Sequence, residues 1–299
     1  MRQVPPPAVL GARRAPPRGA APKSLAPLAQ GAVPPRHLDL AVGAYTLCVA
    51  LSLTACDADP PRPAPAPVDP KTQIKELTAP RLEATITVDG VLDEDAWSKA
   101  AGTGLFVDVA SGMPNPQIPS QGEARIFWTD QHLFVAIEAY DKTVRGGFPA
   151  DAKDPHLWER DTVEIMIDPD GDGDNRDYYE LQVNPQNLTF DTRYDDYNRP
   201  NGNGRGPFGH EEWTATAERA VKIHGTLDDD SDTDDGYTVE MKIPWAAFDK
   251  ASKAPPTPGS SWRMNFYAMQ NNGGTAWSPI LGLGNFHKAS RFGRVVWGK

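Results

Sequence analysis

The feature that most constrains this chain is the alternation of apolar and polar residues in short segments from residue 76 to the C-terminus. Successive side chains of a β-strand point to opposite faces, so a period of two predicts half-buried strands rather than helices. The clearest segments are a hairpin over 125–128 and 133–140, followed by DTVEIMID, YYELQVN and GYTVEMKIP. Turn residues separate these segments. The sequence therefore predicts an all-β domain over 76–299, an antiparallel β-sandwich of the jelly-roll or immunoglobulin type.

Weaker patterns complete this predicted sandwich. Further strands are expected over 84–88, 189–194, 214–223, 262–270 and 291–297. Two short helical turns are also expected: one over 93–100 with an aspartate N-cap, and one over 244–248 with proline at its first position.

The first 75 residues have a different composition and are not expected to fold with the sandwich. Residues 1–37 are rich in proline, and we interpret them as a leader without function or as the result of a start codon assigned too far upstream. Residues 56–75 form a proline-rich spacer. Between them, 38–55 contain an uncharged apolar run that is too short to span a bilayer but typical of a signal peptide. An uncleaved anchor helix is the alternative.

The apolar run ends in LTAC, which resembles a bacterial lipobox whose cysteine, Cys56, is lipidated and becomes the mature N-terminus. The only other cysteine, Cys48, would leave with the signal peptide, which excludes disulfides from the mature domain. We expect an exported, monomeric domain that is anchored to the membrane of the cell envelope by a lipid; the leaflet stays open.

Charge and motifs exclude several classes of function. The formal net charge of −10 argues against a nucleic-acid-binding protein, which needs basic residues to neutralise phosphates. The sequence contains no GxSxG, HExxH, P-loop or dinucleotide-binding motif. Glu164, Glu180 and Asp161 are conceivable catalytic carboxylates, but the pattern selects no pair among them. We therefore expect a protein without enzymatic activity.

A candidate binding face follows from the alternation in two of the strands. Glu164 lies opposite the apolar positions of its strand, and Gln182 and Asn184 do the same in theirs. Trp158 precedes the first strand, so an aromatic ring would accompany these polar groups. Sugars present apolar C–H faces together with hydroxyl groups, which suits such a combination. The alternative is a merely solvated sheet face.

A second candidate site is the acidic run after the first of these strands. Asp168, Asp170, Asp172 and Asp174 alternate with proline and glycine, and carboxylates in a tight loop suit a hard cation such as calcium. The run is not an EF-hand loop, because no glutamate stands at its twelfth position. A solvated turn is the alternative to a calcium site.

The ordered set of motifs resembles the family 9 carbohydrate-binding modules, within the wider group of DOMON-like sandwiches. The matching stretches are VDGVLDEDAW, WERDTVEIMID, GYTVE leading into IPW, WSP, and RFGRV. The resemblance covers about residues 80–299. It implies a β-sandwich that binds sugar chains without catalysis, often beside polysaccharide hydrolases, with structural calcium.

The resemblance also implies roles for individual residues. Trp158 and Phe286 match the two positions of an aromatic clamp, although tryptophan is usual at the second. Glu164 and Asn184 match polar positions of the binding groove, and Gln182 stands where sugar-binding members carry arginine. Two alternatives stay open: a structural or partner-binding envelope domain with a vestigial groove, and a haem-binding electron-transfer domain of the related type.

In the haem alternative, an axial ligand would come from the methionines of the predicted strands. Met166 lies on the same face as Glu164, and Met264 and Met269 are the other candidates. A polar face is a poor haem pocket, which disfavours this alternative.

Overall fold

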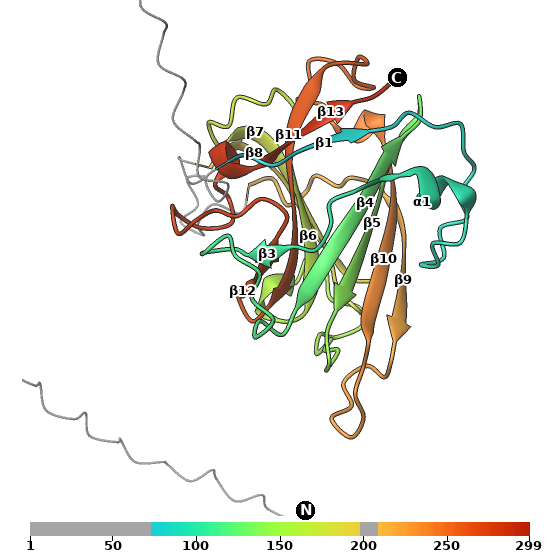
Figure 1. The fold of residues 1–299 in the computed structure, drawn as a ribbon, viewed down its shortest axis with the longest axis vertical. Coiled ribbons are helices and arrows are strands. Elements are labelled where there is room, and N and C mark those ends of the chain that lie inside the picture. Colours follow the sequence, from blue (N-terminus) through green and yellow to red (C-terminus); the bar gives the residue numbers. More distant parts are fainter. Residues whose placement is uncertain (1–72, 198–208) are drawn as a thin grey trace, which may run out of the picture. The chain divides into compact units, whose positions relative to one another are not determined.

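The computed structural model describes residues 73–197 and 209–299. The predicted leader, signal peptide, spacer and lipidation site at Cys56 lie outside these residues. The described part contains β-strands, one α-helix and three 3-10 turns (Figure 1). In chain order they are β1 (Glu76–Ala79), α1 (Asp95–Lys99), β2 (Ala101–Gly102), β3 (Val107–Asp108), β4 (Gln121–Trp128), β5 (His132–Tyr140), η1 (Leu157–Glu159), β6 (Thr162–Asp168), β7 (Arg176–Val183), β8 (Thr189–Asp196), β9 (Glu218–His224), β10 (Gly236–Pro244), η2 (Trp245–Ala247), β11 (Ser261–Gln270), β12 (Gly273–Ala276), η3 (Ala289–Arg291) and β13 (Gly293–Trp297).

The strands form two sheets that pack face to face. One sheet has the order β1-β13-β11-β6-β7-β8, with β12 and β3 added beside β11, and the other has the order β2-β4-β5-β10-β9. All pairs are antiparallel except β1 with β13. The predicted all-β sandwich is confirmed. We refer to the first as the site sheet, because the candidate site lies on it.

The main core fills the space between the sheets and has an aromatic end. Alternate residues of the predicted strands, such as Val135, Ile165 and Val239, are buried there. Four tryptophans meet with ring centroids 5.2–6.2 Å apart and close to perpendicular, an arrangement that aromatic pairs favour: Trp128, Trp245, Trp262 and Trp297.

The outer face of the second sheet is covered by α1 and the segment before it (Figure 1). The buried carboxylate of Glu240 on β10 accepts hydrogen bonds from the backbone N–H of Asp89 and Gly90, both at 2.9 Å, and from Nε1 of Trp97 at 3.0 Å. Gly90 has φ of +84°, and a Cβ there would lie 2.7 Å from the backbone nitrogen of Lys222. One glutamate therefore holds the whole DG-turn and helix motif against the sheet.

Several local predictions were wrong in this region. Residues 84–88 form no strand, because their alternating apolar side chains pack onto the outer face of the sheet without joining a ladder. The N-cap of α1 is Glu94, whose side chain accepts from the backbone of Thr87 rather than capping the helix. Strand β9 begins at Glu218, later than expected.

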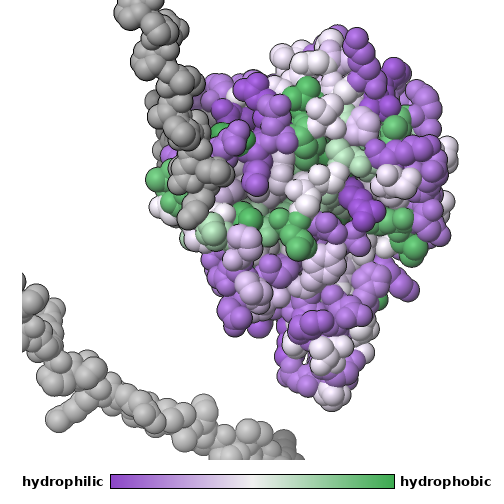
Figure 2. Space-filling model, viewed as in Figure 1, coloured by the Kyte–Doolittle hydropathy of each residue, from purple (hydrophilic) through white to green (hydrophobic). Residues whose placement is uncertain are grey.

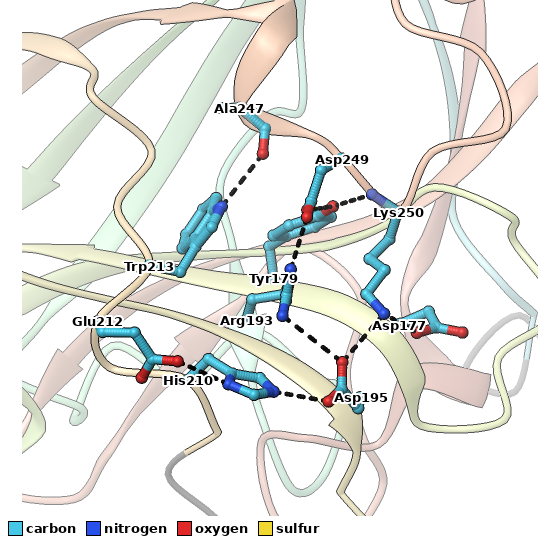
Figure 3. A network of polar contacts seen from close by, with 10 residues as sticks. All are labelled: Asp177, Tyr179, Arg193, Asp195, His210, Glu212, Trp213, Ala247, Asp249 and Lys250. Atoms are coloured by element: carbon cyan, nitrogen blue, oxygen red, sulfur yellow. Dashed lines mark hydrogen bonds and ion pairs between the residues drawn. The ribbon is translucent and has the colours of Figure 1, made fainter.

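Polar side chains tie the edge strand β8 to the segment after η2 (Figure 3). Arg193 bridges Asp249 and Asp195, and Lys250 also reaches Asp195 at 3.0 Å. His210 lies between Asp195 and Glu212, with nitrogen–oxygen distances of 2.6 and 2.8 Å. These carboxylates raise the pKa of His210, and the pKa of Asp195 falls to about 2.

The face seen in Figure 2 is mostly hydrophilic, with apolar residues in small separate groups. Among the described residues, no helix has the length and apolar character needed to cross a membrane.

Candidate functional site

The candidate site lies on the outer face of the site sheet, where β6 and β7 are neighbours. Glu164 is directly opposite Gln182 in the register, and Glu180 lies two residues from Gln182 on the same face. The prediction that Glu164 and Gln182 share a face is therefore confirmed. This face is not solvated, because Glu164 and Gln182 are only 2% and 1% exposed.

A second apolar cluster covers this face and explains its burial. Tyr178, Tyr194 and Tyr267 project from β7, β8 and β11, and the segment around Phe286 packs over them. The cover leaves a cavity of about 220 Å³. It is lined by Trp158, Glu164, Glu180, Gln182, Tyr194, Tyr197, Met269, Asn272, Asn285, Phe286 and His287.

The floor of the cavity is a hydrogen-bonded chain of carboxylates and one amide. Nε2 of Gln182 donates to Oε2 of Glu164 at 3.0 Å and to Oε1 of Glu180 at 2.6 Å. The hydroxyl of Tyr194 donates to the second oxygen of Glu180 at 2.7 Å. Two acceptor atoms, Oε1 of Glu164 and Oε1 of Gln182, are buried without a partner. Unpaired buried polar atoms cost free energy, so these two oxygens are the candidate atoms for hydrogen bonds with a ligand.

The two floor carboxyls are difficult to ionise together. Burial and the nearby charge of Glu180 raise the pKa of Glu164 well above its ordinary value. Burial also raises the pKa of Glu180 to about 7, against the opposing effect of its hydrogen bonds from Tyr194 and Gln182. The pair therefore retains protons at pH values where exposed glutamates have lost them.

The aromatic walls of the cavity are held by specific contacts. The backbone oxygen of Trp158 accepts from the backbone N–H of Asn272 at 2.8 Å, and the indole stacks on His156 at 4.4 Å. The hydroxyl of Tyr267 donates to the backbone oxygen of Phe286 at 2.9 Å. Trp158 and Phe286 line the same cavity, as an aromatic clamp requires.

A third wall consists of Tyr197 stacked on His287, with ring centroids 4.2 Å apart. Nδ1 of His287 lies 2.8 Å from the hydroxyl oxygen of Tyr178. Burial lowers the pKa of His287 to about 3, so the imidazole is neutral at physiological pH.

The structure places Asn184 away from the cavity lining. Its Oδ1 accepts from the backbone N–H of Gln186 and Leu188 at 3.1 and 2.9 Å, so it stabilises the turn between β7 and β8. Alternation continues only as far as the strand does, and β7 ends at Val183.

Sequence reasoning missed most of the remaining lining. Glu180 was weighed only as a catalytic carboxylate, although the same alternation that selected Gln182 selects it too. Tyr194 could have been found by extending the alternation to β8. Tyr197, Asn285 and His287 come from loops and carry no periodic signal.

Three of the four predicted calcium ligands come together in the β6–β7 loop. Asp168, Asp170 and Asp172 each place one carboxylate oxygen within 4.8 Å of the others. Burial and a hydrogen bond with Asp170 raise the pKa of Asp168 to about 7. Asp174 instead accepts from the backbone N–H of Arg176 and lies near its guanidinium. The first three supply hard oxygen donors and fit a calcium ion.

The floor carboxyls are not arranged for glycoside hydrolysis. A pair of catalytic carboxyls must leave space between them for the anomeric carbon or a water. Here the amide of Gln182 binds both Glu164 and Glu180 and fills that space.

The methionines do not favour a haem site either. Met166 belongs to the outer cluster and Met264 to the main core, so they lie on opposite faces of the site sheet. Met269 does line the cavity, but about 220 Å³ is below the roughly 300–1,000 Å³ typical of pockets for drug-sized ligands.

Comparison with known proteins identifies the family. The model of the carbohydrate family 9 binding domain-like proteins matches residues 88–298. The chain belongs to this family. Its members are non-catalytic carbohydrate-binding modules, which confirms both the resemblance noted from the sequence motifs and the expectation that the protein is not an enzyme.

Relatives of this family 9 domain include proteins known by sequence and by structure. A protein of Arthroderma benhamiae named "Extracellular protein" is 26% identical over 192 residues, which cover 62% of this chain and 82% of its own length. A putative carbohydrate-binding protein from Bacteroides uniformis has a TM-score of 0.56 and 22% identity, covering 75% of this chain and 100% of its own.

A further solved relative is a family 9 module from Caldicellulosiruptor kristjanssonii in complex with cellotriose. It has a TM-score of 0.50 and 19% identity, and covers 75% of this chain and 95% of its own. At these identities the structural likeness shows the shared sandwich fold of this family 9 domain.

Proposed function

We propose that the domain binds a sugar unit of a poly- or oligosaccharide in the cavity of the site sheet, without chemical conversion. The observation that carries this proposal is the pair of unpartnered buried acceptors, Oε1 of Glu164 and Oε1 of Gln182, at the floor of an aromatic-lined cavity. Aromatic rings can stack on the C–H face of a sugar while the floor accepts hydrogen bonds from its hydroxyls. The cellotriose bound by the module from Caldicellulosiruptor kristjanssonii supports a glucan-like ligand.

A broad glycan array followed by titration calorimetry tests the proposal. Replacing Trp158 with alanine should weaken the tightest ligand tenfold or more, because the stacking wall is lost. Trp213→Ala is the matched control. This half-buried tryptophan lies on the core side of the site sheet, outside the cavity, where it donates a hydrogen bond to the backbone oxygen of Ala247. Its replacement should therefore leave the affinity for the ligand within twofold of the wild type. A folded wild-type protein that binds no glycan would overturn the proposal and favour a vestigial groove.

We also propose that the domain acts at the bacterial cell envelope, held by a lipid on Cys56 and supporting polysaccharide breakdown as a monomer. The LTAC motif and the proline-rich spacer behind it support this location. Metabolic labelling with a fatty acid should tag the wild type and not Cys56→Ser. Equal labelling of both proteins would contradict the lipid anchor.

Calcium is the ion we propose for the loop of Asp168, Asp170 and Asp172. The closeness of their carboxylates supports this assignment, since a divalent cation would offset their mutual repulsion. When bound, the ion would hold the β6–β7 loop and so the ends of the two strands that carry the cavity floor.

A further inference from the structure

The charges at the floor of the cavity point to a ligand more specific than a neutral sugar. Glu164 and Glu180 are both buried, and among the described residues that line the cavity there is no lysine or arginine. The one basic residue in the lining is His287, whose Nε2 lies 3.8 Å from Oε2 of Glu180 and whose imidazole is neutral. The floor thus holds carboxyl groups without a countercharge.

The hydrogen-bonding atoms left without a partner at the floor are all of one kind, just as its ionisable groups are all carboxyls. Both unpartnered atoms, Oε1 of Glu164 and Oε1 of Gln182, are oxygens, and both are acceptors when Glu164 is ionised. The amide nitrogen of Gln182 is already engaged with Glu164 and Glu180. A sugar hydroxyl donates one bond and leaves its own lone pairs unsatisfied at such a floor, whereas an ammonium group has three donors and no lone pair to satisfy.

The walls of the cavity suit a cation as well. Trp158, Tyr197 and Phe286 come from three different segments and line the same cavity as the two carboxyls. Aromatic rings attract cations, and more strongly where water is excluded. A quaternary ammonium would fit these walls but has no N–H to donate to Glu164, so a primary ammonium matches the floor better.

We propose that the cavity selects a sugar unit that carries a protonated amino group, a hexosamine without an N-acyl substituent, over the corresponding neutral sugar. This inference rests on the proposed sugar site. The ammonium group lies against Oε1 of Glu164 and Oε1 of Gln182, and the ring stacks against the aromatic walls. Binding therefore releases a proton that the buried carboxyl pair retains and forms an ion pair with hydrogen bonds between the ammonium group and the floor.

The titratable groups that face the two carboxyls add no positive charge. Tyr178 and Tyr194 approach Glu180, and Tyr267 approaches Glu164 from β11. Their pKa values are all raised by burial, so each is a neutral hydroxyl. The ligand is then the one source of countercharge within this described lining.

Three trisaccharides with the same β-1,4-linked backbone and different groups at C2 test the proposal. Cellotriose has a hydroxyl, chitotriose an ammonium and triacetylchitotriose a neutral acetamide. Calorimetry near pH 6.5 at low salt should show chitotriose binding at least tenfold more tightly than either neutral sugar. If cellotriose binds equally well or better, the inference fails while the proposed sugar site stands. If no trisaccharide and no array glycan binds, both fail.

Isosteric variants separate the floor carboxyl from general electrostatic attraction. Glu164→Gln should reduce the preference for chitotriose to within threefold of cellotriose, and Glu180→Gln is a second variant should the first fold poorly. The matched control is Glu159→Gln, because Glu159 is exposed beside Trp158 and outside the lining, and it should keep the full preference. Preference that survives in Glu164→Gln, or is lost equally in Glu159→Gln, would overturn the assignment.

Discussion

The buried carboxyl pair makes a testable contribution to the pH dependence of folding. A carboxyl whose pKa is higher in the folded than in the unfolded state binds more protons when folded. The free energy of unfolding therefore falls as the pH rises from the unfolded value to the folded one. For Glu180 this window runs from 4.5 to about 7. The pKa of Glu164 is shifted in the same direction, so its contribution has the same sign.

The magnitude follows from the shift. A rise from 4.5 to about 7, at roughly 1.4 kcal/mol for each pKa unit, corresponds to about 3–4 kcal/mol lost between pH 4.5 and 7. Glu164→Gln removes one of the two interacting carboxyls, so that Glu180 can ionise without a neighbouring charge, and keeps a carbonyl oxygen for the amide of Gln182. We expect it to recover about 1–3 kcal/mol at pH 8, which raises Tm by about 3–10 °C for a domain of this size. At pH 4.5 the variant and the wild type should differ little.

Thermal melts of ligand-free protein at fixed calcium concentration, from pH 4.5 to 8, measure this difference. The quantity to plot is the Tm of the variant minus that of the wild type, because other raised carboxyls such as Asp141 and Asp161 are present in both. The exposed variant Glu159→Gln should give a flat line near zero. A flat line for Glu164→Gln, or a variant that is less stable than the wild type at pH 8, would refute the reasoning.

Three other perturbations probe separate parts of the fold. Glu240→Ala removes the acceptor of three hydrogen bonds and should cost about 2–4 kcal/mol in denaturant melts, since buried donors lose a charged partner; a cost under 1 kcal/mol would contradict its role. Chelation should lower Tm by about 5–10 °C if calcium is present at a hundred times its Kd, and Asp168→Asn should abolish this response; a melt that chelation leaves unchanged would exclude calcium. His210, whose pKa is raised, should stabilise the fold below about pH 6.5 and lose that effect as the pH rises through its folded pKa. His210→Gln should therefore cost more free energy of unfolding at pH 5.5 than at pH 8.5. The difference should be less than about 1 kcal/mol, because the ion pairs of His210 are exposed. An equal cost at both pH values would show that these pairs do not stabilise the protein.

The sequence alone determined the β-sandwich architecture and two of the residues at the floor of the cavity, Glu164 and Gln182. Alternation in β6, β7 and β10 reports which side chains face the core, because a strand has only two faces. That rule placed Glu164 and Gln182 on one side, and the ordered motifs brought Trp158 and Phe286 to the same site. Alternation failed at residues 84–88, where an extended segment packs on a sheet without joining it.

The tertiary structure alone decided that the polar face is buried and that its two carboxyls have no basic partner in the described lining. Whether β6 and β7 are neighbours depends on sheet order, and whether their outer face meets water depends on a loop more than a hundred residues later in the chain. Periodicity describes one strand at a time and cannot report what covers it. The partners of Gln182, the unpartnered Oε1 of Glu164 and the neutrality of His287 all depend on how the strands and the covering segments pack together. These contacts, rather than the residue types, determine the chemistry of the cavity.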